Sequence, residues 1–166
     1  MPRTCSIVVR ALADDVYRHV SDPSRMGEWS PENLGATVHG DPGHARVGMG
    51  FDGRNKRGWF RWATRCTVTA AEEGRLFRFR VHAIGIRRPR LPVAMATWEY
   101  RLEAVPDGTR VTETWTDDRR SWPDPVVWVY DRVATGGRTF AEFQRWNIHT
   151  TLRNLKLALE QPSSTV

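Results

Sequence analysis

The chain has 166 residues, the size of one domain, and is long enough to bury about 70% of its unfolded surface. Its net charge of +6 comes almost wholly from arginine, because lysine occurs only at positions 56 and 156. No apolar run approaches the roughly 18 residues that a membrane-spanning helix needs, which excludes such a helix.

A basic charge can indicate binding to nucleic acid or to a membrane, but arginine in place of lysine is also typical of a GC-rich bacterial genome. We favour the second explanation and expect no specific nucleic-acid partner and no stable membrane insertion. The N-terminal sequence "MPRTCSIVVR" lacks the long apolar core and the cleavage site of a signal peptide, so we expect a cytoplasmic protein. Cys5 and Cys66 fit no metal spacing and are too few for a disulfide framework. We therefore expect reduced thiols, no metal and no cofactor.

The N-terminal third predicts one strand followed by two short helices. Residues 5–11 form the strand, and residues 13–20 form a helix with an acidic first turn and an apolar face. In residues 21–29, Asp22 or the preceding serine caps a second helix, Pro23 occupies its first turn and Gly27 ends it. Trp29 stands at the far end of these turns and caps, an unusual setting for a large apolar residue.

The next ninety residues show a period of two, which predicts an antiparallel sheet with one dry face. The expected strands cover residues 36–40, 46–54, 60–70, 76–82, 93–105 and 109–118, and residues 54–58 form a turn. Alternation places these side chains inward: Val47, Met49, Phe51, Phe60, Trp62, Thr64, Cys66, Val68, Phe77, Phe79, Val81, Ala96, Trp98, Tyr100, Leu102, Val111 and Trp115.

Residues 137–160 predict one long helix, and residues 161–166 a flexible tail. The apolar face of this helix also carries Gln144, Asn147 and Thr151, all in its N-terminal half. Two explanations stay open: a solvated helix start, or a helix half that faces a cavity containing water or a polar ligand.

This order of elements resembles the START-like superfamily, also called SRPBCC or helix-grip, and within it the polyketide cyclase/dehydrase-like members. The similarity lies in "DPSRMGEWSPE", "VGMGFDGRNKRGWFRW", "TWEYRLEAVPDGTRVTETW" and "NIHTTLRNLKLALE", which together span nearly the whole chain. The resemblance implies an α+β fold in which a curved antiparallel sheet wraps a long C-terminal helix. It covers the chain as one domain, residues 1–166.

The resemblance also implies an apolar pocket between sheet and helix that binds a lipid, a polyketide or a similar molecule. We expect a volume of about 300–1,000 Å³; the alternative is a solid aromatic core. Trp29 is either a gate of this pocket or a staple that holds the short helices to the sheet. The expected ligand-binding residues are Trp29, Phe51, Trp62, Phe77, Phe79, Trp98, Tyr100, Glu113, Trp115, Gln144, Asn147 and Thr151.

Two functions from different classes follow: a non-catalytic binding protein, which we favour, or a polyketide cyclase, aromatase or dehydratase. Alternation turns Glu113 inward, where desolvation would raise its pKa and suit it to acid–base work. It could instead turn outward at a bulge or pair with an arginine such as Arg138. Trp128 or Tyr130 could reach a partner subunit, so a homodimer is possible.

Overall fold

The computed structural model describes residues 2–41, 43–120, 122–125, 127–128, 132 and 140–161. These parts contain seven strands, the α-helices α1 and α3 and one 3₁₀ helix, and residues 124–125 and 127–128 are also helical. In chain order the elements are β1 (Arg3–Val9), α1 (Ala13–Val20), η1 (Pro23–Glu28), β2 (Asn33–Val38), β3 (Gly50–Arg57), β4 (Phe60–Glu72), β5 (Leu76–Gly85), β6 (Leu91–Val105), β7 (Gly108–Asp117) and α3 (Phe140–Glu160).

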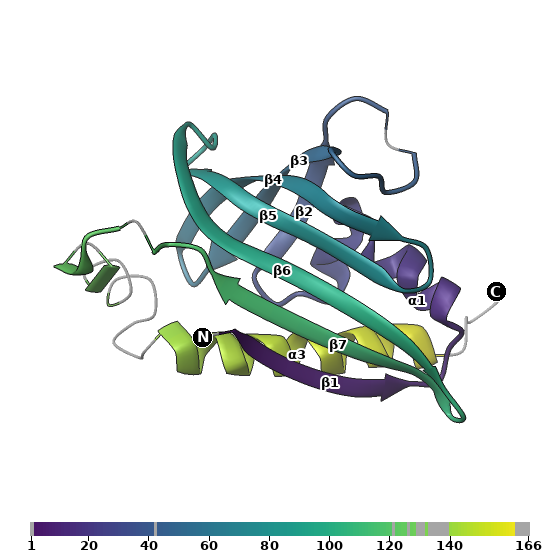
Figure 1. The fold of residues 1–166 in the computed structure, drawn as a ribbon. Coiled ribbons are helices and arrows are strands. Elements are labelled where there is room, and N and C mark those ends of the chain that lie inside the picture. Colours follow the sequence, from purple (N-terminus) through teal and green to yellow (C-terminus); the bar gives the residue numbers. More distant parts are fainter. Residues whose placement is uncertain are drawn as a thin grey trace.

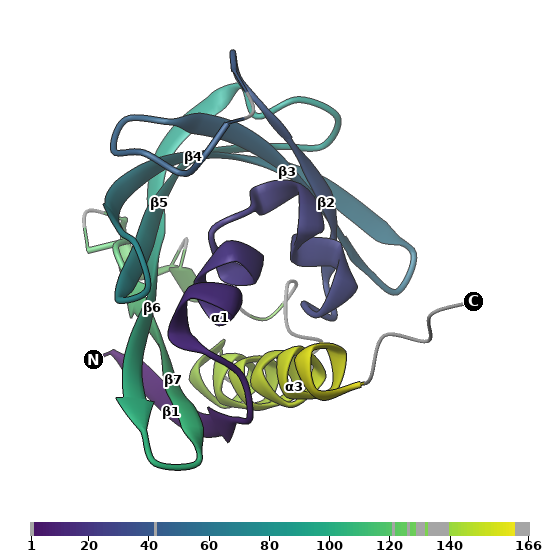
Figure 2. The same cartoon turned by 90° about the vertical axis from the view of Figure 1, so that its right-hand side faces the viewer.

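The strands form one curved sheet in the order β1-β7-β6-β5-β4-β3-β2, and every neighbouring pair is antiparallel. Figure 2 shows the sheet as an arc around α1 and η1, with α3 closing the open side of the arc. In Figure 1, α3 runs beside β1 and β7 for most of the length of these strands. The predicted helix-grip fold is confirmed.

Alternating burial along the central strands fixes which side chains face α3. In β7, Thr109, Val111, Glu113 and Trp115 are buried, whereas the intervening residues are more exposed. β5 follows the same rule, and so does β6 from Tyr100 onward, whereas the neighbours Met95 and Ala96 of β6 are both buried. The buried residues of β5 and β6 join those of β7 in one core with α1 and the C-terminal half of α3. A period of two in the sequence therefore predicted the facing of β5, of β7 and of the second half of β6.

The first helices form as expected from their caps and charges. Asp14 and Asp15 lie in the first turn of α1, where carboxylates interact favourably with the helix dipole. The Asp22 side chain caps η1 by accepting from the backbone N–H of Ser24, and proline occupies the first turn. η1 ends at Glu28, and the next residue, Trp29, is buried in the core.

The predicted boundaries of β3 were wrong at both ends. β3 begins at Gly50, so Val47 lies outside the strand and is 66% exposed rather than inward. Gly48, at a φ of +86°, breaks the extended backbone at this point. At the other end β3 continues to Arg57, and the turn falls after it instead of at residues 54–58. Phe60, at the start of β4, is also exposed.

α3 ends at Glu160, as predicted, and its described start is Phe140; the expected residues 137–139 lie outside the described range. Its last turns are tied to the edge strand β1 and the segment after it. The Lys156 ammonium donates to the Val8 carbonyl at 2.6 Å, and the Glu160 carboxylate accepts from the Arg10 backbone N–H at 2.7 Å. α3 therefore makes two side-chain hydrogen bonds to the backbone of β1 and of the segment after it, in addition to packing its apolar face on the sheet.

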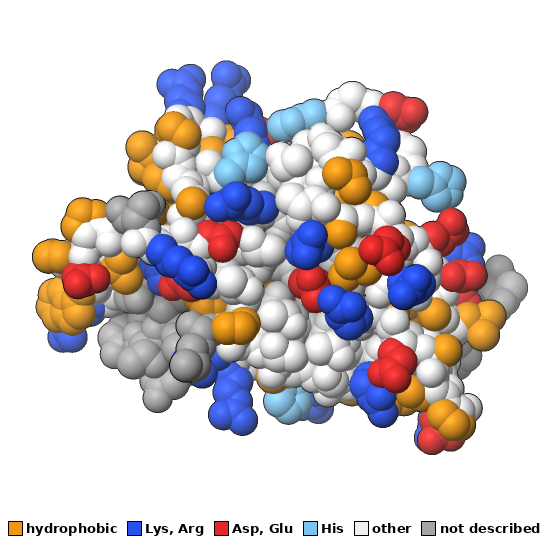
Figure 3. All heavy atoms as spheres, viewed as in Figure 1, with side chains coloured by type: hydrophobic (Ala, Val, Ile, Leu, Met, Phe, Trp, Pro, Cys, Tyr) orange, Lys and Arg blue, Asp and Glu red, His pale blue; other side chains and the backbone are white. Residues whose placement is uncertain are grey.

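The surface charge is interspersed. Figure 3 shows basic and acidic side chains mixed over the face formed by β5, β6 and β7. Ion pairs account for this mixture, among them Arg78 with Glu99 and Arg80 with Asp118. A continuous basic stripe, the usual footprint of nucleic-acid binding, is not seen on this face. Over the described residues, no helix has the length and apolarity needed to cross a bilayer.

Candidate ligand cavity

A cavity of about 90 Å³ lies between the sheet and the middle of α3. η1, the segment that follows it, six of the seven strands and α3 each contribute to its wall. The lining residues are Met26, Trp29, Ser30, Glu32, Asn33, Phe51, Asn55, Cys66, Phe79, Trp98, Tyr100, Glu113, Asn147 and Thr151. The location is the one predicted, but the volume is well below the expected range of about 300–1,000 Å³. Aromatic side chains fill most of the space, so the solid-core alternative holds for part of the interior.

Eight of the twelve expected ligand-binding residues line this cavity, and four do not. Phe77 is fully buried next to Phe79, at the closed side of the core. Trp62 lies nearer the start of β4, stacked on Phe60, and Trp115 lies further along β7 in the core. Gln144 lies nearly one turn before the helix residues that reach the cavity. A prediction that a side chain points inward was not sufficient to predict that it lines the cavity, because its position along the strand or helix also matters.

Six lining residues were not among the expected ones: Met26, Ser30, Glu32, Asn33, Asn55 and Cys66. Cys66 was predicted to face inward, so alternation carried a signal for it. Asn55 fell in the expected turn, and the half-buried Ser30, Glu32 and Asn33 follow η1 in a segment without periodicity. These four polar residues mark the side on which the cavity approaches solvent.

Trp29 is buried, with 1% of its surface exposed, and forms part of the cavity wall. Its ring packs edge-on against Tyr100, with the centroids 5.9 Å apart. Its backbone carbonyl accepts from the side-chain amide of Asn154 at 3.1 Å. Trp29 therefore lines the cavity and also joins η1 to both the sheet and α3, so the gate and staple explanations overlap.

Tyr100 and Glu113 form a buried pair at the cavity wall. They are opposite each other in the β6–β7 register, and the tyrosine hydroxyl donates to Glu113 Oε1 at 2.9 Å. Burial raises the pKa of Glu113 to about 8, against a smaller lowering by the tyrosine hydrogen bond. Burial and the adjacent carboxyl group raise the pKa of Tyr100 well above its usual value. Near neutral pH both side chains are therefore mainly uncharged. Arg138, considered as a partner of Glu113, lies outside the described residues.

Four buried polar atoms around this cavity have no hydrogen-bond partner among the described residues. They are Trp29 Nε1, Glu113 Oε2, Asn147 Oδ1 and Gln144 Oε1. The first three belong to lining residues, and Gln144 is buried on the same helix. Buried polar groups are usually hydrogen-bonded in native proteins. The polar N-terminal half of α3 is therefore not a solvated helix start, since Gln144, Asn147 and Thr151 are all buried.

The cavity offers no reactive thiol, because burial raises the pKa of Cys66 to about 12 and keeps it protonated. In the portion of the chain that can be described, no three His, Cys, Asp or Glu side chains come together as a metal site. The polar groups of the cavity are thus two carboxyl groups, Glu113 and the Arg57-paired Glu32, a phenol, two indoles, amides and hydroxyls.

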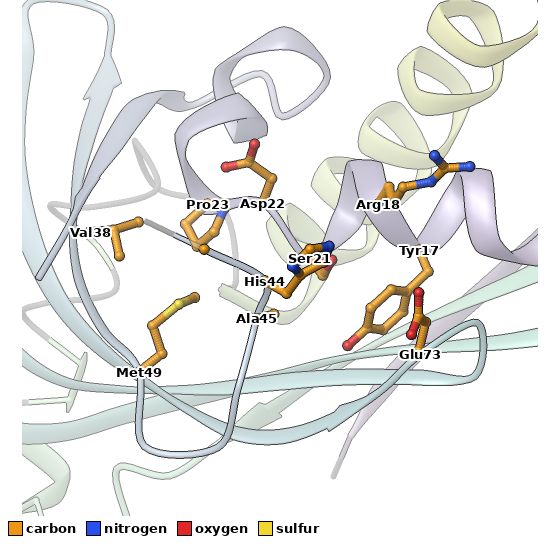
Figure 4. Close-up of a pocket in the computed structure, with 11 residues that line it drawn as sticks. Tyr17, Arg18, Ser21, Asp22, Pro23, Val38, His44, Ala45, Met49 and Glu73 are labelled. Atoms are coloured by element: carbon orange, nitrogen blue, oxygen red, sulfur yellow. The ribbon is translucent and has the colours of Figure 1, made fainter. Parts of the chain in front are cut away.

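A second hollow of about 290 Å³ lies between α1, η1, the β2–β3 connection and the β4–β5 turn. Figure 4 shows side chains of α1 and η1, such as Tyr17 and Pro23, together with Met49 and Glu73 around it. None of its lining residues holds an unpaired buried polar atom among those that the structure describes. The inner cavity is the better candidate, because three of the four unpaired buried polar atoms found in the described part of the chain belong to its lining residues.

Known structures with the same fold span nearly the whole chain. A polyketide cyclase-like protein from Corynebacterium glutamicum is 27% identical over 96% of this chain and 89% of its own, with a TM-score of 0.56. Major latex-like protein 151 from Panax ginseng is 11% identical, with a TM-score of 0.66, over 97% of this chain and 98% of its own. The di-domain aromatase/cyclase StfQ of the steffimycin biosynthetic pathway is 15% identical, with a TM-score of 0.66, over 96% of this chain and 50% of its own.

Among curated proteins, none matches the sequence significantly. A family model does match it, over residues 4–160, and therefore includes β1 apart from its first residue, all the cavity-lining residues and the whole of α3. By this match and by its fold, the chain belongs to the polyketide cyclase/dehydrase and lipid transport family.

Proposed function

We propose that this protein binds a small hydrophobic molecule, or the end of a larger one, in the cavity between the sheet and α3. The observation that carries the proposal is the cavity itself, whose aromatic walls come from Trp29, just after η1, and from three strands, and whose polar groups lie at defined points. Ligand sites in proteins commonly combine apolar walls with a few polar groups that fix orientation. Lipid, polyketide or a similar compound fits this chemistry, in line with the family.

Native mass spectrometry of the freshly purified protein tests for a bound molecule directly. The site is tested by titrating ¹⁵N-labelled protein with toluene and following the amide and indole resonances. We expect saturable shifts at Trp29 and its neighbours. Thr151→Phe places a ring in the cavity and is expected to abolish these shifts. Thr150→Phe, on the outer side of the same helix, is the matched control and is expected to keep them. Absence of saturable binding in the folded wild-type protein would refute the proposal.

A second candidate function is a polyketide cyclase or dehydratase, and the observation that favours it is the buried Tyr100–Glu113 pair. A carboxyl group whose pKa is about 8 can donate or accept a proton near neutral pH. Against it, the described residues that line the cavity include no histidine and no reactive cysteine. Incubation with linear poly-β-ketone mimics distinguishes the two functions. We expect no cyclised or dehydrated product above background; product that is lost in Glu113→Gln would establish the enzyme.

A further inference from the structure

The unpaired polar atoms of the cavity comprise both donors and acceptors. Trp29 Nε1–H can only donate, and the amide oxygen Asn147 Oδ1 can only accept. Glu113 Oε1 already accepts from Tyr100, so a neutral Glu113 carries its proton on Oε2 and donates from there. Three cavity-lining residues, one after η1, one in β7 and one in α3, thus leave two donors and one acceptor without a partner among the described residues.

A ligand group that satisfies all three atoms must donate once and accept twice. A hydroxyl group does this, since it has one O–H and two lone pairs. A carbonyl can accept but leaves Asn147 Oδ1 unpaired, and an ammonium can donate but leaves both donors unpaired. A carboxylate leaves Asn147 unpaired and also introduces a charge into a cavity where Glu113 is only 1% exposed.

We propose that the cavity recognises a neutral hydroxyl group at one end of its ligand, which donates to Asn147 Oδ1 and accepts from Trp29 Nε1 and Glu113 Oε2. This inference rests on the proposed binding function and specifies the ligand class: an alcohol, a phenol or an enol. Phe51 and Phe79 line the same cavity, with ring centroids 5.3 Å apart, and provide an apolar contact for the rest of the ligand.

Phenol and toluene form a matched pair of probes, because they differ only in a hydroxyl against a methyl group. A dry apolar void binds apolar rings, so a cavity without the proposed hydrogen bonds favours toluene. At pH 6, where Glu113 is neutral, we expect phenol to bind at least tenfold more tightly than toluene, equivalent to about 1.4 kcal/mol. Benzoate, the third probe, is expected to bind at least tenfold more weakly than phenol.

Asn147→Leu removes the acceptor and retains the size of the side chain. We expect it to abolish the preference for phenol, whereas Thr150→Leu, on the outer side of α3, retains it. If Asn147→Leu does not fold, Trp29→Phe removes one donor and keeps a ring, and it is expected to lower the preference several-fold. Trp146→Phe, on an exposed tryptophan of α3, is its control.

The outcomes separate this inference from the function on which it rests. Toluene binding as tightly as phenol, benzoate binding as tightly as phenol, or a preference that survives Asn147→Leu would each overturn the hydroxyl site and leave hydrophobic binding intact. A crystal structure with phenol bound elsewhere and water on Asn147 Oδ1 and Glu113 Oε2 would also overturn it. Failure of both phenol and toluene to bind would remove the binding function as well.

Discussion

Glu113→Gln should change the pH dependence of stability more than any other conservative substitution in the cavity. Glutamine has the shape of the neutral carboxylic acid and can still accept from Tyr100. It cannot ionise. The wild-type protein, in contrast, must either keep a proton on Glu113 or bury a charge, because the side chain is 1% exposed. No ion pair involving Glu113 occurs within the described ranges, and the other carboxylate of the cavity, Glu32, is paired with Arg57.

The direction and the size of this pH dependence follow from the raised pKa of Glu113. Between pH 4.5 and about 8 the folded protein holds a proton on Glu113 that the unfolded chain has released. Raising the pH therefore favours unfolding, by about 1.4 kcal/mol per pH unit in this window. Relative to Glu113→Gln, we expect the wild-type protein to lose roughly 2 kcal/mol by pH 6 and roughly 4 kcal/mol by pH 8. Above pH 8 the difference levels off, because both states are then ionised.

Urea unfolding of both proteins at unit intervals from pH 5 to pH 9 measures this difference. Surface carboxylates titrate equally in the two proteins and cancel when the curves are subtracted. Glu103→Gln is the control: Glu103 is exposed in a surface pair with Arg110, so we expect a change below about 1 kcal/mol at every pH. Parallel curves for wild type and Glu113→Gln would refute the reasoning, since they would show that burial does not raise the pKa of this carboxyl group.

Three further predictions concern neighbouring residues. Tyr100→Phe leaves Glu113 Oε1 without its donor and should lower the free energy of unfolding at pH 6 by about 1–3 kcal/mol in urea titrations; an unchanged midpoint would contradict the observed pair. Trp29→Ala removes a buried ring from the junction of η1, sheet and helix and should cost about 3–5 kcal/mol in the same assay. The Cys66 thiol, whose pKa is about 12, should react with a disulfide reagent only after denaturant is added, and rapid labelling of the native protein at Cys66 would contradict its burial.

The fold could be predicted because its physical signals are local and repeated. Side chains of β5, of β7 and of the second half of β6 alternate between core and solvent, so a period of two identified these strands. The polar face of α3 carried a signal for the site: Asn147 and Thr151, four residues apart, lie on one face and reach the same cavity. The helical pattern alone did not decide whether these residues face a cavity or form a solvated helix start, because the answer depends on which residues pack against this face of α3.

Other features depended on contacts that periodicity does not encode. Residues 54–58 resemble a turn, yet β3 stays paired with β4 as far as Arg57, whose guanidinium also has two side-chain partners. It lies 3.8 Å from the centre of the Phe143 ring and pairs with Glu32. Cavity volume is likewise a property of three-dimensional packing, so a count of inward aromatic rings overestimated it. Of the two residues considered for a dimer contact, Trp128 is exposed and Tyr130 lies outside the described range, so the homodimer stays a prediction.

The bonds from the end of α3 to Val8 and Arg10 also bear on aggregation. The sheet is open, so β1 is an edge strand, and its row of free backbone groups is a template for pairing with another chain. Lys156 and Glu160 occupy two backbone groups at the C-terminal end of this edge, where a foreign strand would otherwise bind. The same helix that closes the ligand cavity therefore also covers one end of the β1 edge. We therefore expect removal of the last turn of α3, which carries Glu160, to lower the solubility of the protein more than it changes the cavity, which this helix lines with Asn147 and Thr151.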